Sequence, residues 1–206
     1  MKKTAAAIAW CSLAAIASSA GAQQADPGPW LVRLRGVHLD PANKSDPVGG
    51  TGASDRIDVN AKNIPDLDIS YFFTPHWATE LVLTTPQKQT VYLDRQNIGS
   101  FKQLPPTLTL QYHFAPESRL SPYVGAGVNY TRITDVHLLG GAARLDDSSV
   151  GLALQAGLDY KLDRHWSLNV DVKKIRIDSD VKTDAGKISN VQIDPWLFGV
   201  GVGYRF

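Results

Sequence analysis

The strictest constraint on this chain is the alternation in its last fifteen residues, QIDPWLFGVGVGYRF at positions 192–206. Every second position is bulky and apolar, from Trp196 through Val200 to Phe206, whereas the positions between them are mostly small and end in Arg205. A period of two is typical of a β-strand. A soluble sheet would need a second layer to cover the apolar face, whereas in a membrane barrel that face contacts lipid and the small face points into the lumen.

The same alternation recurs along the chain and predicts eight strands. The predicted strands are residues 30–40, 63–73, 77–85, 106–114, 122–131, 148–160, 165–177 and 192–206. The connections alternate between long and short, and the long ones are polar and largely without periodicity, so we interpret them as loops. These loops are residues 41–62, 86–105 (with local order expected only near 91–93), 132–147 and 178–191. The alternation loses phase at Lys174, which suggests a bulge or a strand leaving the membrane.

Outer-membrane barrels have an even number of strands, short periplasmic turns and longer extracellular loops, as predicted here. A soluble lipocalin-like barrel would place the apolar residues inside. The polar faces carry too many small and charged residues for a dry core, aromatic residues fall at strand ends, and the chain ends on phenylalanine. We therefore predict an all-β fold, an eight-stranded antiparallel transmembrane β-barrel with short periplasmic turns and four longer extracellular loops.

The first residues have the pattern of an export signal. Lys2 and Lys3 precede an apolar run at residues 5–17, which a small-residue cleavage site follows. The run is short for a membrane helix, and the pattern indicates a secretory signal peptide. We expect residues 1–22 to be removed and residues 23–206 to form a single outer-membrane β-barrel domain.

The composition of the mature chain excludes several kinds of partner. Cys11 is the only cysteine and leaves with the signal peptide, so we expect no disulfide and no thiolate metal site. The chain has 21 basic and 20 acidic residues, and removal of Lys2 and Lys3 leaves 19 basic residues. This near-neutral balance argues against a nucleic-acid partner. We expect no cofactor.

The inward positions of the predicted strands carry charges of both signs, as well as several glycines. The lumen-lining candidates are Arg33, Arg35, Asp66, Asp68, Glu80, Gln111, His113, Asn129, Gln155, Asp159, Asp171, Lys173 and Arg205. Side chains just fill an eight-stranded barrel, which excludes a wide pore. The charges fit either a ladder of internal ion pairs or a polar solute path. The glycines fit either strong strand curvature or empty volume for a narrow passage along their wall.

Prolines near the loop-side strand ends are candidates for an opening in the wall, because each removes one donor from the hydrogen-bond ladder. The lateral-opening candidates are Pro65, Pro105, Pro106 and Pro195. They either end their strands at the rim or loosen the pairing enough for lateral release. At the end of the chain, Tyr204 and Phe206 are predicted to form the signal that the barrel-assembly machinery reads.

Four segments resemble a known family of small outer-membrane proteins, the OmpW family. They are LPPTLTLQYHF at 104–114, PYVGAGVNYT at 122–131, GLDYKLDRHWSLNVDV at 157–172 and DPWLFGVGVGYRF at 194–206. The resemblance covers essentially the whole mature chain. It implies an eight-stranded barrel in the Gram-negative outer membrane that passes small, often hydrophobic molecules, with release sideways through the wall into the bilayer.

The resulting hypothesis is a narrow outer-membrane channel for uptake of small hydrophobic or amphipathic molecules. The expected partners are outer-membrane lipid, the barrel-assembly machinery and those solutes, and no oligomer is required. The cationic stretch at residues 173–176 leaves anions or amphipathic acids open as cargo. The alternative is a non-transporting envelope or surface-interaction barrel that acts through its extracellular loops. We expect no enzyme, because the five histidines lie in separate elements without a neighbouring serine pattern or metal-site spacing.

Overall fold

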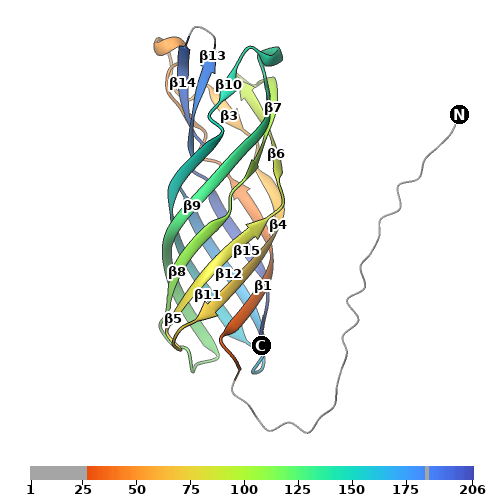
Figure 1. The fold of residues 1–206 in the computed structure, drawn as a ribbon, viewed down its shortest axis with the longest axis vertical. Helices are drawn as coiled ribbons and strands as arrows, with labels where there is room; N and C mark the ends of the chain where they lie inside the picture. Colours follow the sequence, from red (N-terminus) through yellow and green to blue (C-terminus); the bar gives the residue numbers. More distant parts are fainter. Residues whose placement is uncertain (1–26, 184–185) are drawn as a thin grey trace, which may run out of the picture.

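The computed structural model describes residues 27–183 and 186–206. Within these residues, eight long strands form a closed antiparallel barrel, which confirms the predicted fold class (Figure 1). The barrel strands in ring order are β1 (Trp30–Asp40), β4 (Lys62–Phe72), β5 (Trp77–Thr84), β8 (Thr107–His113), β9 (Leu120–Leu138), β11 (Ser148–Lys161), β12 (Trp166–Ile175) and β15 (Trp196–Arg205). β15 pairs with β1 and closes the ring. The expected signal peptide at residues 1–22 lies outside the described residues.

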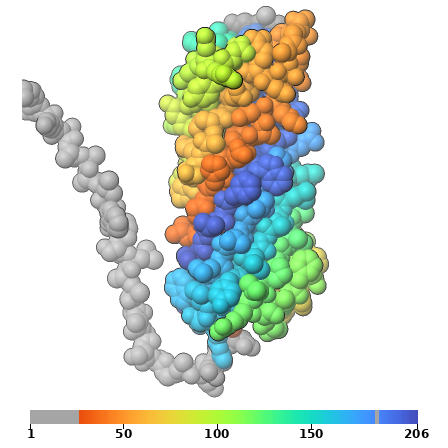
Figure 2. All heavy atoms as spheres, turned by 180° about the vertical axis from the view of Figure 1, so that it is seen from behind, coloured from red at the N-terminus to blue at the C-terminus, as the bar shows by residue number. Residues whose placement is uncertain are grey.

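The alternation of each strand separates an outer apolar face from an inner face. Leu108, Leu110, Leu154 and Phe198 are 49%, 50%, 62% and 47% exposed on the outer surface. The strands wind obliquely around the barrel, and the blue band of β15 lies beside the orange-red band of β1 (Figure 2). In the lipid-facing part of the described barrel each strand pairs with a neighbour on both sides, and the apolar outer surface is suited to lipid.

Aromatic rings gather on the outer face near the barrel end that carries the short turns. Edge-to-face pairs with ring centroids 4.8–5.4 Å apart are Trp30–Tyr71, Tyr71–Phe73, Trp77–Tyr112, Tyr112–Phe114, Trp166–Tyr204 and Tyr204–Phe206. These rings have an apolar body and, in Trp and Tyr, one polar group, so they favour the boundary between hydrocarbon and water. This ring of aromatic residues marks the periplasmic membrane interface.

The four long connections are more ordered than expected, and their interpretation as irregular loops is wrong. β9 continues as far as Leu138, and two further hairpins and several short pieces extend the barrel above its lipid-facing part (Figure 1). These elements are β2 (Lys44–Ser45), β3 (Ile57–Val59), β6 (Gln87–Leu93), β7 (Gln96–Leu104), β10 (Arg144–Leu145), β13 (Asp178–Thr183) and β14 (Gly186–Gln192), with 3-10 turns η1 (Val48–Gly50) and η2 (Leu139–Gly141). The described part of the chain contains no helix long and apolar enough to cross a membrane.

The β6–β7 hairpin was missed because its turn lacks the usual sequence signal. Asp94 and Arg95 form the turn with φ angles of 49° and 68°. Such left-handed two-residue turns match the twist of a hairpin, but Asn-Gly or Asp-Gly normally marks them. Arg56 Nε donates a 2.9 Å hydrogen bond to Asp94, which lowers the pKa of the Asp94 carboxyl. Both side chains are exposed, so this pair contributes little to stability.

The strand faces keep their phase beyond Lys174, so the bulge reading is wrong, and the other reading holds: the chain leaves the lipid-facing part of the barrel there. Ile175 and Ile177 remain buried, while Lys174 is half-exposed and Arg176 is exposed. The interior changes instead: it is polar within the lipid-facing part of the barrel and apolar in the extension above it. Hydropathy therefore reverses along the strand although the side chains continue to alternate in direction.

Candidate functional site

A layer of charged side chains crosses the interior at mid-height, and we call it the charged belt. Its members are Arg33, Arg35, Asp66, Asp68, Glu80, Asp159, Asp171 and Lys173, all of them buried. The register of β1 and β4 places Arg33 opposite Asp68 and Arg35 opposite Asp66. Arg35 also contacts the Asp68 carboxylate. Antiparallel pairing thus brings charges of opposite sign to one level.

Glu80 of β5 is the carboxylate that all three cations of the belt share. Its Oε2 lies 2.9 Å from Arg33 Nη1, and its Oε1 lies 3.4 Å from Lys173 Nζ and 3.6 Å from Arg35 Nη2. Gln155 Nε2 donates a 2.9 Å hydrogen bond to the same Oε1. Glu80 is fully buried, so its charge is balanced by these three cations and not by water.

The opposite wall supplies two further carboxylates from β11 and β12. Asp159 Oδ2 lies 2.7 Å from Arg33 Nη2. Asp171 Oδ1 lies 2.8 Å from Lys173 Nζ and 3.3 Å from Arg35 Nη1. Each cation is therefore held from both sides of the lumen, and the interior charges form a network of ion pairs that closes the barrel at this level.

Tyr123 of β9 joins this network, although the sequence analysis did not single it out. It is 1% exposed, and its hydroxyl donates to Asp171 Oδ2 at 2.9 Å and accepts from Asn169 Nδ2 at 3.0 Å. The His113 ring stacks on it at 4.9 Å, and the Arg33 guanidinium carbon lies 5.3 Å from its centroid. The alternation of side chains along β9 already places Tyr123 on the inward face. This alternation was the sequence signal for its role in the interior.

The inward glycines make room for these bulky groups. A Cβ atom at Gly157 would lie 2.3 Å from the Tyr123 ring. One at Gly201 would lie 2.7 Å from Arg35 Cγ and 2.1 Å from the Leu34 carbonyl oxygen. Of the two readings of the inward glycines, empty volume for a passage is therefore wrong at these positions, because neighbouring side chains and backbone occupy that volume.

The remaining lumen-lining candidates lie on either side of the belt. Gln111, His113, Asn129 and Gln155 are buried, whereas Arg205 is half-buried at the periplasmic end. Gln111 Nε2 donates to Gln155 Oε1 at 3.1 Å, which extends the polar network below Glu80. Among the residues that the structure describes, no group of three or more His, Cys, Asp or Glu is placed to hold a metal ion.

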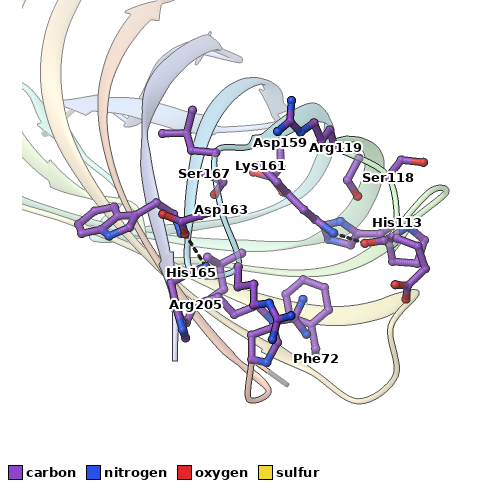
Figure 3. Close-up of a pocket in the computed structure, with 18 residues that line it drawn as sticks. Phe72, His113, Ser118, Arg119, Asp159, Lys161, Asp163, His165, Ser167 and Arg205 are labelled. Atoms are coloured by element: carbon purple, nitrogen blue, oxygen red, sulfur yellow. Dashed lines mark hydrogen bonds between the residues drawn. The ribbon is translucent and has the colours of Figure 1, made fainter. Parts of the chain in front are cut away.

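Below the belt, a cavity of about 420 Å³ forms the periplasmic vestibule (Figure 3). Its lining includes Phe72, His113, Arg119, Asp159, Lys161 and Arg205. Arg205 Nε donates to the Gly28 carbonyl at 2.9 Å, and its guanidinium carbon lies 4.2 Å from the Phe72 ring centroid. Asp159 belongs to both the vestibule and the charged belt, so the vestibule ends where the ion pairs begin.

Above the belt, apolar side chains from both the barrel and the extension form a core that we call the upper chamber. Its buried members are Val37, Leu39, Ile57, Val59, Ile64, Val91, Phe101, Ile133, Leu138, Ala143, Ala153, Ile175, Ile177, Val181, Val191, Ile193 and Leu197. It contains a cavity of about 50 Å³ whose lining is apolar except for Ser179. Many of these residues lie in the four long connections, where no alternation in the sequence indicated a chamber.

The cationic stretch at residues 173–176 does not line the mouth of the lumen. Lys173 belongs to the belt, and Ile175 is buried in the upper chamber. Lys174 lies on the outer face, with its Nζ 5.0 Å from the Trp196 ring centroid, and Arg176 is exposed. The stretch therefore does not present its charges to one passage, and the sequence argument that left anions open as cargo loses its basis.

Between belt and chamber lies a junction cavity of about 20 Å³. Its lining combines residues of both layers and includes Ile64, Asp66, Thr84, Pro105, Lys173 and Ile175. At this level paired charges and apolar side chains line the same cavity. The wall at Thr84 and Pro105 is also where the strand pairing changes.

The wall is interrupted beside this junction, between residues 60–65 and residues 85–90. Below, the pairing of β4 with β5 ends at Asp66 and Thr84, and above, the pairing of β3 with β6 begins at Val59 and Val91. No strand pairing joins the two segments in the described part of the chain. We call this interruption the wall gap.

A few local contacts bridge the wall gap. Asn60 N–H donates to the Thr90 carbonyl at 3.3 Å, and Asn60 Oδ1 accepts from Thr90 N–H at 2.6 Å. Lys62 Nζ donates to the Lys88 carbonyl at 3.0 Å. Pro65, which has no N–H, lies at the lower end of the gap. The Pro65 carbonyl accepts from Thr84 Oγ1 at 3.0 Å. Among the described residues, side chains therefore take part in three of the four hydrogen bonds that bridge the gap.

The other proline candidates occupy two kinds of position. Pro105 and Pro106 lie between the β5–β8 pairing, which ends at Thr107, and the β6–β7 pairing, which begins at Gln103. Their carbonyl groups each accept a 3.2 Å hydrogen bond from Asn129 Nδ2. Pro195 precedes β15, and its carbonyl accepts from Ile175 N–H at 3.2 Å, so it continues the ladder rather than interrupting it.

A closed eight-stranded wall with an apolar outer face, and with residue 206 bonded to β1 at the short-turn end, defines the class of outer-membrane β-barrels. Residues 26–206 match the OmpW family. The chain belongs to the OmpW family, as its resemblance predicted, and it is a protein of the Gram-negative outer membrane.

Comparison with individual proteins agrees with this assignment. The chain is 43% identical over 185 residues to the uncharacterized outer-membrane protein y4mB of Sinorhizobium fredii, covering 86% of this chain and 80% of that protein. It is 34% identical to Outer membrane protein W of Vibrio cholerae, covering 95% and 98%. The crystal structure of OprG from Pseudomonas aeruginosa matches with a TM-score of 0.78 at 30% identity, covering 88% of this chain and 97% of OprG.

Proposed function

We propose that this protein is a narrow outer-membrane channel that takes small hydrophobic or amphipathic molecules into the upper chamber and releases them sideways through the wall gap. One observation carries the proposal: the apolar chamber ends on a closed layer of ion pairs, and the wall is interrupted at the same level. A molecule that leaves the chamber can therefore reach the lipid through the wall gap, whereas the charged belt separates it from the periplasmic vestibule.

The two routes out of the chamber, through the charged belt and through the wall gap, differ in their free-energy cost. Loss of one partner of a buried ion pair costs about 3–5 kcal/mol, because the other charge is left uncompensated, and a path through the belt would leave several charges in that state. In the described part of the chain the wall gap is bridged by four hydrogen bonds, each with a net contribution of about 0.5–1.5 kcal/mol. An apolar solute gains from entering lipid and would gain nothing from a polar vestibule. Lateral release is therefore the easier path.

In this proposal a single barrel carries out transport. It requires no enzyme activity, no cofactor and no oligomer. The alternative, a surface barrel that acts through its extracellular extension, requires neither a chamber nor a gap. The two differ in one measurable respect, because only the channel carries solute across a reconstituted membrane.

Closing the wall gap with a disulfide tests the lateral route. The backbones of Asn60 and Thr90 are hydrogen-bonded across the gap, so the pair Asn60→Cys and Thr90→Cys is placed for a cross-link. The mature chain is expected to lack other cysteines. In proteoliposomes, oxidation of this double variant is expected to reduce the influx of a medium-chain alcohol by about tenfold, equivalent to about 1.4 kcal/mol, and reduction should restore it.

The matched control is a cross-link where the wall is already paired. Leu67 and Leu83 are register partners on the outer face of β4 and β5, so Leu67→Cys with Leu83→Cys staples the same two strands below the gap. Its influx should not change on oxidation. Unchanged influx through the cross-linked gap would exclude the lateral route, and the absence of influx in the unmodified barrel would favour the surface-protein alternative.

We also propose that the assembly machinery reads the end of β15. Phe206 is 61% exposed, its N–H donates to the Trp30 carbonyl at 2.9 Å, and its ring contacts Tyr204. Deletion of Phe206 is expected to lower the yield of folded barrel several-fold, measured as the heat-modifiable band of outer-membrane fractions. Leu120→Ala removes another exposed apolar group and is the control. A normal yield of the truncated chain would contradict the assignment.

A further inference from the structure

We infer that the cargo carries an uncharged hydrogen-bonding head group on an apolar body, and that Gln89 and Gln103 bind this head group. The inference deepens the proposed transport function and rests on it for the route of the cargo. It narrows the substrate class from hydrophobic molecules in general to uncharged amphiphiles such as alcohols and primary amides.

Two buried amides in the β6–β7 hairpin carry this inference. Gln89 and Gln103 are 0% and 1% exposed. Neither the Nε2 nor the Oε1 atom of either side chain has a hydrogen-bond partner among residues 27–183 and 186–206. Buried amides are normally satisfied, because an unmade hydrogen bond retains the full cost of desolvation. Two such groups side by side therefore indicate a site for a polar partner.

The register places the two amides close together on the inward face. Gln103 is the direct partner of Gln87, and Gln89 is the direct partner of Phe101, two residues further along each strand. Gln89 and Gln103 are therefore diagonal neighbours in the hairpin, within reach of one small group. Gln87 differs from them because its Nε2 donates to the Thr85 carbonyl at 2.8 Å and to its hydroxyl at 2.9 Å.

The amide pair lies between the upper chamber and the wall gap. On its upper side, Val91 and Phe101 line the cavity of the chamber. On its lower side, Pro105 lines the junction cavity. Gln89 itself belongs to the segment 85–90 that borders the gap. A molecule that moves from the chamber to the gap therefore passes the two amides.

The chemistry of the pair selects the head group. Each primary amide offers two N–H donors and one carbonyl acceptor, so together they satisfy a group that both donates and accepts, such as a hydroxyl or another primary amide. An alkane leaves all of these atoms unsatisfied. An ionised carboxylate can use the donors, but the amides provide no counter-charge, and the nearby Lys173 is already paired with Glu80 and Asp171. The site therefore favours an uncharged head group over both alternatives.

Influx of three probes of equal chain length tests this selectivity. The probes are a medium-chain alkane, its primary alcohol and its carboxylate, supplied to vesicles with lipopolysaccharide in the outer leaflet, with protein-free vesicles subtracted. We expect the mature protein to pass the alcohol about tenfold faster than the alkane and to exclude the carboxylate. The double variant Gln89→Leu, Gln103→Leu should lose the tenfold preference while it keeps alkane influx.

The matched control is Gln87→Leu, which alters the same wall of the barrel but removes an amide that is already bonded; it should keep the preference. The double variant is expected to fold, because leucine removes two unsatisfied groups, and heat-modifiable mobility verifies this. A preference that survives in the folded double variant overturns the inference.

A binding measurement separates this inference from the transport proposal. The side-chain amide NMR signals of Gln89 and Gln103 in lipid nanodiscs should shift on addition of the alcohol and not on addition of the alkane. Shifts without influx would overturn the transport proposal and leave the binding site in place. Influx without preference and without shifts would overturn the binding site and leave the transport proposal in place.

Discussion

Replacement of Glu80 by glutamine is expected to destabilise the barrel by about 3–5 kcal/mol, because three buried cations lose the carboxylate they share. Arg33 lies 2.9 Å, Lys173 3.4 Å and Arg35 3.6 Å from the Glu80 oxygens. Glutamine keeps the shape of the side chain and removes the charge, so the change isolates the electrostatic contribution. The measurement is the free energy of unfolding from reversible urea titration in phospholipid vesicles.

Glu117→Gln is the control for the Glu80 variant. Glu117 lies exposed in the turn at the periplasmic end, so its free energy of unfolding should stay within about 0.5 kcal/mol of the parent protein. If the Glu80 variant unfolds at the same urea concentration as the parent, the charged belt does not hold the barrel together, and the energetic argument against a path through the belt is lost.

Introduction of lysine at Leu154 is expected to cost about 2–4 kcal/mol, because a charged group would enter the hydrocarbon part of the bilayer. Leu154 is 62% exposed on the outer face of β11. The same substitution on a soluble surface would be close to neutral. The free energy of unfolding in phospholipid vesicles measures the difference directly.

Thr134→Lys provides the matched control for Leu154→Lys. Thr134 is exposed on β9 in the part of the strand that pairs with β7 above the lipid-facing wall. A lysine there should change the free energy of unfolding by no more than about 1 kcal/mol, because the position is outside the hydrocarbon. Equal costs at the two positions would mean that the outer face of β11 does not contact hydrocarbon.

The lipid-facing half of the barrel could be predicted because the alternation within each strand shows which of its side chains face lipid. Leu108 and Leu110 alternate with Thr107 and Thr109, and a period of two fixes which side chains share a face. Closure into a barrel follows from the number of such strands and the lengths of their connections. The inward position of Arg33, Asp68 and Glu80 follows from the same parity, without knowledge of their partners.

The extracellular half could not be predicted in the same way, because its interior has the opposite chemistry. Ile175 and Ile177 keep the parity of the strand but replace polar inward groups with apolar ones, which resembles a loss of phase in the sequence. The hairpin turn at Asp94 and Arg95 lacks a glycine, so nothing local marked it. Its inward residues, among them Gln89, alternate with polar outward residues and give no contrast between faces.

Local alternation in the sequence thus determined the eight strands, the direction of every side chain in the membrane and the class of protein, because those properties depend on neighbours along one strand. Only the tertiary structure decided which carboxylate each cation contacts, that apolar residues from four connections form one chamber, and that the wall is interrupted beside Pro65 and Gln89. The physical reason is that these features arise between strands distant in sequence, whose relative register is fixed only when the barrel closes.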